Sequence, residues 1–566
     1  MSAVANARSP TLARFNLAAL RTSLRSPWTW LSLALLGLLL VFLVWPVFNI
    51  LSASFFGRAA DGRSGWAILF SDPRYMKALG NTIILGLSVT LFASLIGVPL
   101  AYFTARFDFP GKSFVAILPL ITLVIPEVIA AQTWLMIFGN NGVLTRAASE
   151  WFDITLPSFY GWPGLVLVMT FTYYAYVYIG TLAAVRGFDV QLEEAAQSLG
   201  SPPTEARLKI MLPVLRPAVL ASALLVFTLV TGNFATSMIL GHKVELLSVL
   251  TYQATVSEIG SSPVMQSTLA STSIALVMAT LFVQRWIVNR GRYEITQGRG
   301  APSRPIRGAA GVVFALVAVV VVALTMLPLV TLVVGAFTRA RGPVMRWGEW
   351  TFANLERVFV NAPEPVWNTM LYSAIATTIG VVMATLVSYL IVKKKSLITP
   401  WLDYLSSLPL ALSGTVIGIG LMMTFSKGWL SLSGTASIIV LAYVVRRLSF
   451  GVRNASSTLF NISNSIEEAS ISLGVPPVTT FFRAVLPLMI PAIAAAAVLT
   501  WTTTVAELSA SVIVYSPGRE TMPIQIFRLI DSGLMAQASA YGLLLIAVIV
   551  VPVLIATKLF KIKLFA

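Results

Sequence analysis

The sequence predicts an all-α polytopic membrane protein with about 12 transmembrane helices, arranged as two tandem six-helix units. One observation is composition: 57% of the 566 residues are hydrophobic and 11% are charged, with a mean hydropathy of +0.84. A chain of this composition has too little polar surface to cover a soluble globule. The other observation is an internal repeat of polar sequence between long apolar runs.

The repeat is a stretch of 26 residues that occurs twice. It reads LEEAAQSLGSPPTEARLKIMLPVLRP at 192–217 and IEEASISLGVPPVTTFFRAVLPLMIP at 466–491. Each residue of the second copy lies 274 positions after its counterpart, as Glu468 does after Glu194, and no insertion interrupts the alignment. A spacing kept this strictly indicates two copies of one unit.

The apolar runs give the candidate spans. The run from Trp28 to Phe48 has tryptophans near both ends and is long enough to cross a bilayer. A cleavable signal peptide is the alternative, but this length favours a retained helix. The expected spans are 28–48, 82–105, 114–138, 161–183, 215–240 and 264–288 in the first half, and 311–337, 368–392, 402–425, 432–450, 488–513 and 536–558 in the second.

An even number of crossings per half makes the two halves parallel in orientation. With both termini on the cytoplasmic side, most of the 39 Lys and Arg residues fall in cytoplasmic segments, as the positive-inside rule requires. The net charge of +17 therefore has a membrane explanation, and we expect no nucleic-acid partner. This topology places both copies of the repeat in the cytoplasm.

The expected domains follow from these spans. A Gly-, Pro- and Arg-rich connector without apolar periodicity indicates a linker between the halves. The predicted divisions are a cytoplasmic N-terminal segment 1–27, a first unit 28–289 with its loop at 188–213, a linker 290–310, and a second unit 311–566 with its loop at 462–487.

Each copy of the repeat has the residue types of a short helix, a turn and a second helix. An acidic pair suits a helix start, small residues allow close packing, and a glycine followed by two prolines ends the first helix. We expect this stiff helix-turn-helix to contact a cytoplasmic partner. The candidate coupling residues are Glu193, Glu194, Ala195, Gly200 and Pro213 in the first copy, and Glu467, Glu468, Ala469, Gly474 and Pro487 in the second.

On these motifs the chain resembles the permease of a bacterial ATP-binding-cassette (ABC) importer of type I, with two units fused. The resemblance rests on EEAAQSLG with MLP, and on EEASISLG with VLP, and the second copy departs from the family pattern only at Ser470. Further matches are the pairs Asn81-Thr82 and Asn368-Thr369, and the segments NFAT (233–236) and ELSA (507–510). The resemblance implies that each loop docks on an ATPase subunit and transmits its closure to the membrane helices.

The resemblance also implies the partners and the location. These are two copies of an ATPase, a periplasmic solute-binding protein and the lipids of the bacterial inner membrane. We expect no catalytic residue, cofactor or metal on this chain, with ATP and Mg²⁺ bound by the ATPase. The sequence has no cysteine and one histidine, His242. Its GKS at 111–113 lacks the upstream glycine of a phosphate-binding loop.

Two carboxylates, Glu127 and Glu507, fall inside expected spans. A charge within hydrocarbon costs roughly 2.5 to 3.5 kcal/mol on insertion scales, so each should face a protein interior or an aqueous path. Local alignment of the halves pairs Glu127 with Thr415, and the 274-residue offset pairs Asn233 with Glu507. These four residues are the candidates for the translocation path, with a structural or gating role favoured for Glu507.

The predicted function is therefore transport without chemistry, driven by a separate ATPase. Ferric iron is the expected solute, and 2-aminoethylphosphonate, sugar phosphate, thiamine and polyamine are the alternatives. A proton-coupled secondary transporter is the competing class, since it also has twelve spans in two halves, but its Gly- and Asp-Arg-rich motif is replaced here by TARFDFPGKS (104–113).

Overall fold

The computed structural model describes residues 26–256, 262–290, 303–305, 308–428 and 430–560. The predicted N-terminal segment 1–27 therefore lies almost entirely outside the described residues, and of the predicted linker 290–310 only residues 290, 303–305 and 308–310 are described. Within them the chain is a bundle of helices, and nine helices are long and apolar enough to cross a membrane. The number is eleven if each of two sharply bent helix pairs is one span.

The first half is built as follows. Its elements in order are α2 (Pro27–Leu39), the π-helix η1 (Leu40–Val44), α3 (Trp45–Phe56), α4 (Gly65–Ser71), α5 (Pro73–Arg106), β1 (Phe107–Asp108), α6 (Lys112–Thr122), α7 (Glu127–Phe138), α8 (Val143–Phe152), α9 (Trp162–Gly187), α10 (Val190–Ser198), α11 (Pro203–Ala206), η2 (Arg207–Met211), α12 (Leu212–Thr231), α13 (Ala235–Leu240), α14 (Leu247–Val256) and α15 (Pro263–Arg290).

The second half repeats most of this order. Its elements are β2 (Arg304–Pro305), α16 (Ala309–Ala336), β3 (Thr338–Arg341), β4 (Val344–Trp350), α17 (Ala353–Glu356), η3 (Arg357–Asn361), α18 (Glu364–Lys393), α19 (Thr399–Ser407), η4 (Leu408–Ala411), α20 (Gly414–Phe425), α21 (Ala436–Asn461), α22 (Ser465–Ser472), α23 (Pro477–Thr480), η5 (Phe481–Val485), α24 (Leu486–Val505), α25 (Ser511–Val514), α26 (Met522–Asp531) and α27 (Met535–Phe560).

The 274-residue offset holds for whole elements. The bounds of α9 and α21 differ by this number at both ends, and so do those of α12 and α24. Both α12 and α24 end earlier than the predicted spans 215–240 and 488–513, at Thr231 and Val505. Asn233 and Glu507 consequently lie in the non-helical turns that follow these helices, and not inside a straight span as predicted.

Two predicted spans, 114–138 and 402–425, are broken helices. The first bends by 107° between α6 and α7, and the second by 112° between α19 with η4 and α20. Pro126 precedes α7 with an extended backbone (ψ 141°), and Ser413 precedes α20 with ψ 158°. Proline lacks the N–H that a continuing helix needs and keeps the residue before it out of the helical region. Neither segment is the single continuous span that the prediction assumed.

The remaining predicted span, 432–450, corresponds to α21. This helix of 26 residues is long enough to cross a membrane but is not among the nine most apolar helices. Every stretch of 18 residues within it contains Arg446, Arg447 and Arg453. Because it matches α9 residue for residue, we assign it as the equivalent span of the second half.

The Asn-Thr pairs fix equivalent joints in the two halves. Asn81 Nδ2 donates to the carbonyl of Glu245, and Thr82 Oγ1 accepts from the backbone N–H of Leu247 at the start of α14. In the second half Asn368 Nδ2 donates to the carbonyl of Glu520, and Thr369 Oγ1 accepts from the N–H of Met522 at the start of α26. Each pair thus satisfies backbone groups at a helix terminus, which are otherwise left without partners.

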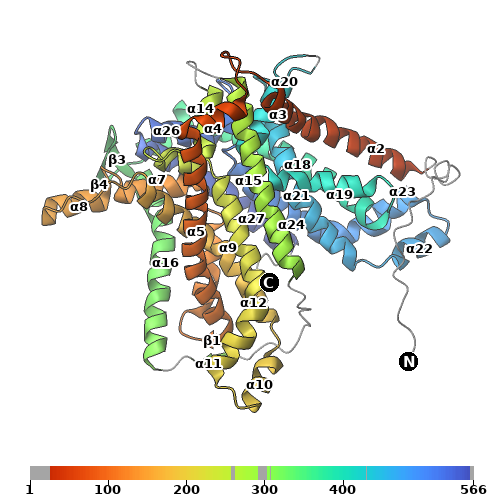
Figure 1. The fold of residues 1–566 in the computed structure, drawn as a ribbon, viewed down its shortest axis with the longest axis horizontal. Coiled ribbons are helices and arrows are strands. Elements are labelled where there is room, and N and C mark those ends of the chain that lie inside the picture. The colour runs from red at the N-terminus through yellow and green to blue at the C-terminus, as the bar shows by residue number, and fades with distance from the viewer. Residues whose placement is uncertain (1–25, 257–261, 291–302, 306–307, 429, 561–566) are drawn as a thin grey trace.

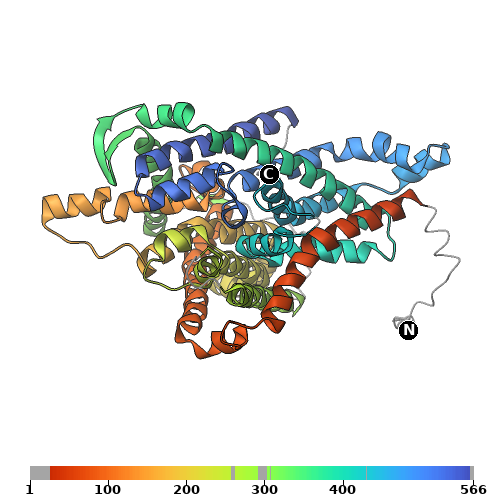
Figure 2. The same ribbon diagram turned by 90° about the horizontal axis from the view of Figure 1, so that it is seen from above.

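The first helix of each half packs against the other half. Leu35 and Leu39 of α2 are buried against α18, α19 and α21. In the opposite direction α16 packs on α6 and α7, with the Phe314 ring stacked on Phe103 at 4.1 Å between centroids. Figures 1 and 2 show α2 lying along the second half, far in sequence from its neighbours. These exchanges join the halves into one body.

In the part of the chain that the structure describes, the strands form two short pairs. Thr338–Arg341 and Val344–Trp350 form an antiparallel hairpin, and two linker residues, Arg304 and Pro305, pair in parallel with β1 at the end of α5. The all-α prediction did not include the hairpin. Its alternation of apolar and polar residues over a few positions was too short a signal beside the apolar runs.

Candidate coupling loops and translocation path

The first polar repeat folds into the predicted helix-turn-helix, formed by α10 and α11. Gly200 adopts the left-handed conformation (φ +91°), and its N–H and that of Ser201 donate to the carbonyls of Gln197 and Ala196. Such bonds satisfy the last carbonyls of a helix and end it. In the second repeat Gly474 (φ +83°) ends α22 in the same way.

The first glutamate of each pair is buried and anchors its loop. Glu193 is 5% exposed, and its carboxylate accepts from Arg106 Nη2 at 2.7 Å and from Arg207 Nε at 3.3 Å. Because Arg106 is the last residue of α5, this ion pair fastens α10 to the C-terminal end of that helix. Burial of a carboxylate is tolerated when it is paired and hydrogen-bonded in this way.

The second loop is anchored with different residues. Glu467 is 7% exposed and accepts from Tyr389 Oη at 2.6 Å and from Lys394 Nζ at 2.7 Å, at the end of α18. Ser470, the departure from the family pattern, shares a hydrogen bond of 2.9 Å with Thr480. At the 274-residue offset, their counterparts in the first loop are Ala196 and Ala206. Two alanines in the first loop thus correspond to a hydrogen-bonded serine and threonine in the second, and the residues at this contact stay small in both.

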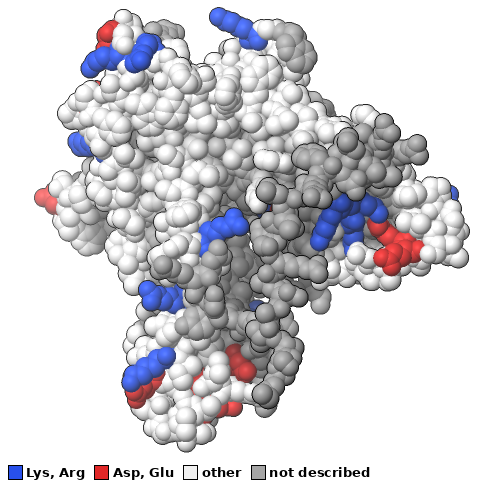
Figure 3. Space-filling model, turned by 45° about the vertical axis from the view of Figure 1, so that its right-hand side comes forward, with Lys and Arg blue, Asp and Glu red and all other residues white. Residues whose placement is uncertain are grey.

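The second glutamate and the loop tip face outward. Glu194 and Glu468 are exposed, and so are Ala195, Ala469, Pro213 and Pro487. Leu199 and Leu473, which directly precede the turn glycines, are 88% and 84% exposed. Figure 1 shows the two loops at the ends of helical arms that diverge, and Figure 3 shows charged side chains gathered at both ends. Each loop therefore presents an apolar tip beside acidic side chains.

The candidate path residues of the first half form one hydrogen-bonded chain. The Oη of Tyr173 donates to Glu127 Oε1 at 2.6 Å, and Asn233 Nδ2 donates to Tyr173 Oη at 2.7 Å. The side-chain oxygen of Asn233 accepts from the backbone N–H of Thr236, which caps α13. Glu127 is the first residue of α7, where the helix dipole favours a carboxylate.

The second half places an ion-pair cluster at the equivalent positions. Glu507, 3% exposed, accepts from Arg446 Nη1 and Arg447 Nη2, and Glu507 Oε1 also accepts from the N–H of Ala510. The offset makes Arg447 the counterpart of Tyr173 and Glu507 the counterpart of Asn233. A neutral hydrogen bond in one half is thus an ion pair in the other.

The two sets belong to different halves and interact electrostatically. Arg446, Glu507 and Arg447 all act electrostatically on Glu127. The helix bounds align Glu127 with Gly414, one residue before Thr415. The structure links Asn233 to Glu127 through Tyr173, and Glu507 acts on Glu127 electrostatically. Thr415 is buried, shares a hydrogen bond with Ser413, and lies outside these contacts.

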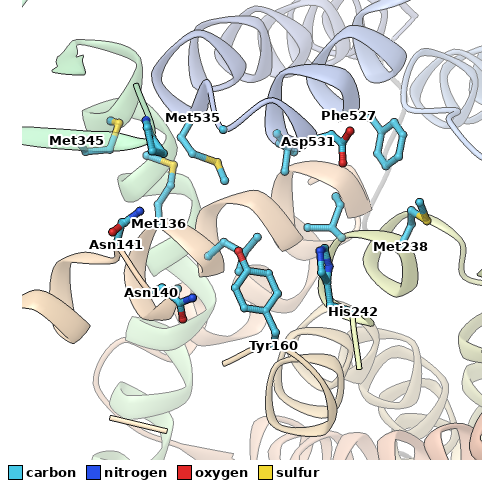
Figure 4. Close-up of a pocket in the computed structure, with 16 residues that line it drawn as sticks. Met136, Asn140, Asn141, Tyr160, Met238, His242, Met345, Phe527, Asp531 and Met535 are labelled. Carbon is cyan, nitrogen blue, oxygen red and sulfur yellow. The ribbon is translucent and has the colours of Figure 1, made fainter. Parts of the chain in front are cut away.

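A pocket of about 310 Å³ lies between the halves at the far end of α7. Figure 4 shows Asn140, Asn141, Tyr160 and His242 from the first half opposite Asp531 of the second, with methionines from both. Burial raises the pKa of Tyr160, so its phenol stays protonated as a hydrogen-bond donor. Between this pocket and Glu127, residues 128–137 of α7 are all buried, so packed side chains separate the two.

Sequence reasoning missed four residues of these sites. Leu199 and Leu473 precede both turn glycines at the 274-residue offset, and that identity was the available signal. Arg446 and Arg447 lie within the predicted span 432–450. Two adjacent arginines in an expected span are as strong a sign of a functional site as the carboxylates that were singled out. Among the described residues, no group of three or more His, Asp or Glu side chains could hold a metal ion.

Comparison with known proteins adds the family. A model described as the binding-protein-dependent transport system inner membrane component matches residues 97–293 and 376–564. A probable ABC transporter permease protein, y4fN, of Sinorhizobium fredii is 28% identical over 88% of this chain and 90% of its own length. A ferric transport system permease protein, FbpB, of Actinobacillus pleuropneumoniae is 25% identical over 92% and 77%. A putative 2-aminoethylphosphonate transport system permease protein, PhnV, of Salmonella paratyphi A is 35% identical over 26% and 56%.

Proposed function

Because the chain belongs to the family of inner membrane components of binding-protein-dependent transport systems, we propose that its two polar loops are the points at which a separate ATPase drives transport. The chain is the multi-pass permease of an ABC importer, with two permease units fused in one polypeptide. Both termini and both loops lie on the cytoplasmic side in this proposal. ATP and Mg²⁺ are bound by the ATPase, and the permease carries no nucleotide site of its own.

The observation that carries the proposal is the design shared by the two loops. Each has a buried glutamate bound to the end of a long membrane helix, and each exposes a second glutamate and a leucine at its tip. An exposed apolar side chain rimmed by charge is typical of a protein contact surface. Two equivalent loops fit two copies of one ATPase, each gripping one loop.

Copurification tests the coupling role directly. We expect an ATPase subunit to copurify with the wild-type chain and to be lost from a variant with Glu194→Arg and Glu468→Arg. Each change reverses the charge of an exposed side chain on the docking surface and makes that side chain longer. A matched control reverses two exposed acidic residues outside the loops, Asp61→Arg and Glu349→Arg, and should keep the ATPase. Transport that continues without any ATPase and stops when the proton gradient is dissipated would favour a secondary transporter instead.

The proposed solute is ferric iron. Its support is similarity over most of the chain to a ferric transport system permease, and a second candidate, 2-aminoethylphosphonate, is supported by the higher identity of the shorter match. A periplasmic binding protein would deliver the solute to the pocket that Asp531 and Tyr160 line between the halves. Measuring what the solute-binding protein encoded beside this chain binds would decide between the candidates, and a protein without affinity for ferric iron would exclude the first.

A further inference from the structure

Arg446 and Arg447 carry more hydrogen-bond donors than the protein around them accepts. Arg446 has a contact from Nη1 to Glu507, and Arg447 has contacts from Nη2 to Glu507 and to the carbonyl of Thr503. The Nε of Arg447 is buried without a partner. The remaining N–H groups of both guanidinium groups are therefore available to a ligand.

The surroundings hold these guanidinium groups at the junction of the halves. Their side chains are 22% and 13% exposed, so most of their water is already removed. A Cβ on Gly414 would lie 1.7 Å from Arg446 Nη1, which means that Arg446 occupies space that only a glycine leaves free. At the equivalent helix start in the first half stands Glu127.

The two arginines also lie well inside their helix and not at its end. Arg447 lies eleven residues after the start of α21, which at the rise of an α-helix is about 16 Å from that end. Tyr173 stands at the same depth in α9. Glu127 belongs to the first half and the two arginines, which act on it electrostatically, belong to the second, so a movement of one half against the other changes their separation.

The chemistry of this space favours an oxyanion. A guanidinium presents parallel N–H groups that match the oxygens of phosphonate, phosphate and carboxylate, and its bonds to them are short and strong when water is excluded. Glu507 offsets one of the two guanidinium charges, so these three side chains keep one net positive charge that an anion can meet. Glu127, held by Tyr173, stands opposite as a partner for a cationic group of the same solute.

We propose that Arg446 and Arg447 form a binding site in the conduit for a solute that carries an oxyanion. This inference rests on the proposed function and narrows it. If the solute is ferric iron, the metal crosses as an anionic oxygen chelate and not as a hydrated cation. If it is an aminophosphonate, its phosphonate meets the arginines and its ammonium group faces Glu127.

The test uses the full chain with its ATPase in lipid nanodiscs and saturation-transfer-difference NMR, which detects weak ligands. The probes are 2-aminoethylphosphonate, gallium citrate as a diamagnetic stand-in for ferric citrate, and spermidine as the cation. We expect signals from one or both anions and weaker or no signal from spermidine. Arg446→Gln and Arg447→Gln should each weaken anion binding about tenfold or more, because each loses a charge-assisted contact.

Two further variants make the result specific. Arg453→Gln removes an exposed arginine of the same helix, which pairs with Asp403, and should leave anion binding unchanged. Arg446→Lys keeps the charge but loses the planar fork, so it should fold and still weaken binding, even if the glutamine variants do not fold. An equal anion signal from wild type, Arg446→Gln and Arg447→Gln would overturn the proposal, as would a wild-type chain that binds only spermidine or no probe.

Copurification on the same preparations separates the two levels of inference. If the ATPase stays bound in wild type and in Arg446→Gln while anion binding is unchanged, only the oxyanion site fails. If no ATPase accompanies the wild-type chain, the coupling proposal itself fails.

Discussion

Glu467 shows how one side chain can connect the second polar loop to the membrane helices. Its carboxylate is shared between Tyr389 and Lys394 at the end of α18, and little of it reaches water. Its neighbour Glu468 has the same chemistry but is exposed. The two positions thus separate the anchoring contact of the buried glutamate from the docking role that we propose for the exposed one.

We predict that Glu467→Gln loosens α22 from α18 while leaving it able to meet the ATPase. An amide cannot replace the charge opposite Lys394, and hydrogen bonds to charged groups contribute about 1.5 to 3 kcal/mol. Hydrogen–deuterium exchange should therefore be faster at residues 465–480 in this variant. Glu468→Gln is the matched control and should exchange as wild type does; equal protection in both variants would mean that the buried pair does not anchor the loop.

The charged residues of the path were partly predictable. Glu127 and Glu507 stand out in the sequence because a carboxylate in an apolar run needs a reason. Their partners were not predictable, since Tyr173 and Asn233 are ordinary residues until the fold brings them together. The pairing of Glu127 with Thr415 by local alignment was one residue away from the helix register, because a broken helix offers no continuous period to align.

At the scale of the element, each polar loop is a helix-turn-helix with an apolar tip. The turn glycine ends the first helix, two prolines follow, and a short second helix leads into the next span. The leucine before the glycine is largely exposed in both copies, so packing within its own loop does not explain why a leucine stands there. Its equivalent placement in the two loops points to a partner that meets both in the same way.

We expect Leu199→Asp with Leu473→Asp to abolish ATPase copurification, because one charge would have to be buried at the centre of each contact. Loss of a central apolar anchor typically costs about 2 kcal/mol or more per interface. Leu397→Asp is a fair control: it changes a leucine that is 74% exposed in the turn between α18 and α19, outside both loops. Retention of the ATPase by the double loop variant would remove the leucines from the docking surface.

The sequence predicted the loops more accurately than the spans next to them. Gly and Pro act locally, so a glycine before two prolines ends a helix whatever surrounds it. The bends at Pro126 and Ser413 depend on the other half as well, because the freed backbone groups need protein around them. Hydropathy alone reads such a segment as one span, and it cannot place the turns at Asn233 and Glu507.

At the scale of the whole molecule, the exchange of first helices makes the two halves one mechanical body. Leu35 and Leu39 of α2 are buried in the second half, and Phe314 of α16 is stacked on the first. Span counting could not predict this, because a helix of uniform apolarity does not say which neighbour it packs on. The arms that carry the loops nevertheless diverge (Figure 1), which leaves them free to approach.

The anchoring of α10 to α5 leads to a prediction about this movement. Because Glu193 ties the first loop to Arg106, we expect α10 and the end of α5 to move together, while the distance between the two loops shortens when the ATPase closes on nucleotide. The chain has no cysteine, so spin labels can be attached to Ser198→Cys and Ser472→Cys without background, and electron–electron double resonance can measure their separation. Labels on Ser198→Cys and Lys112→Cys report motion within the first half.

With the ATPase and a non-hydrolysable ATP analogue, the distance between the labels of the first pair should become shorter, and that of the second pair should stay constant. A loop-to-loop distance that ignores nucleotide, or a change confined to the pair within one half, would contradict the transmission of closure through rigid loops.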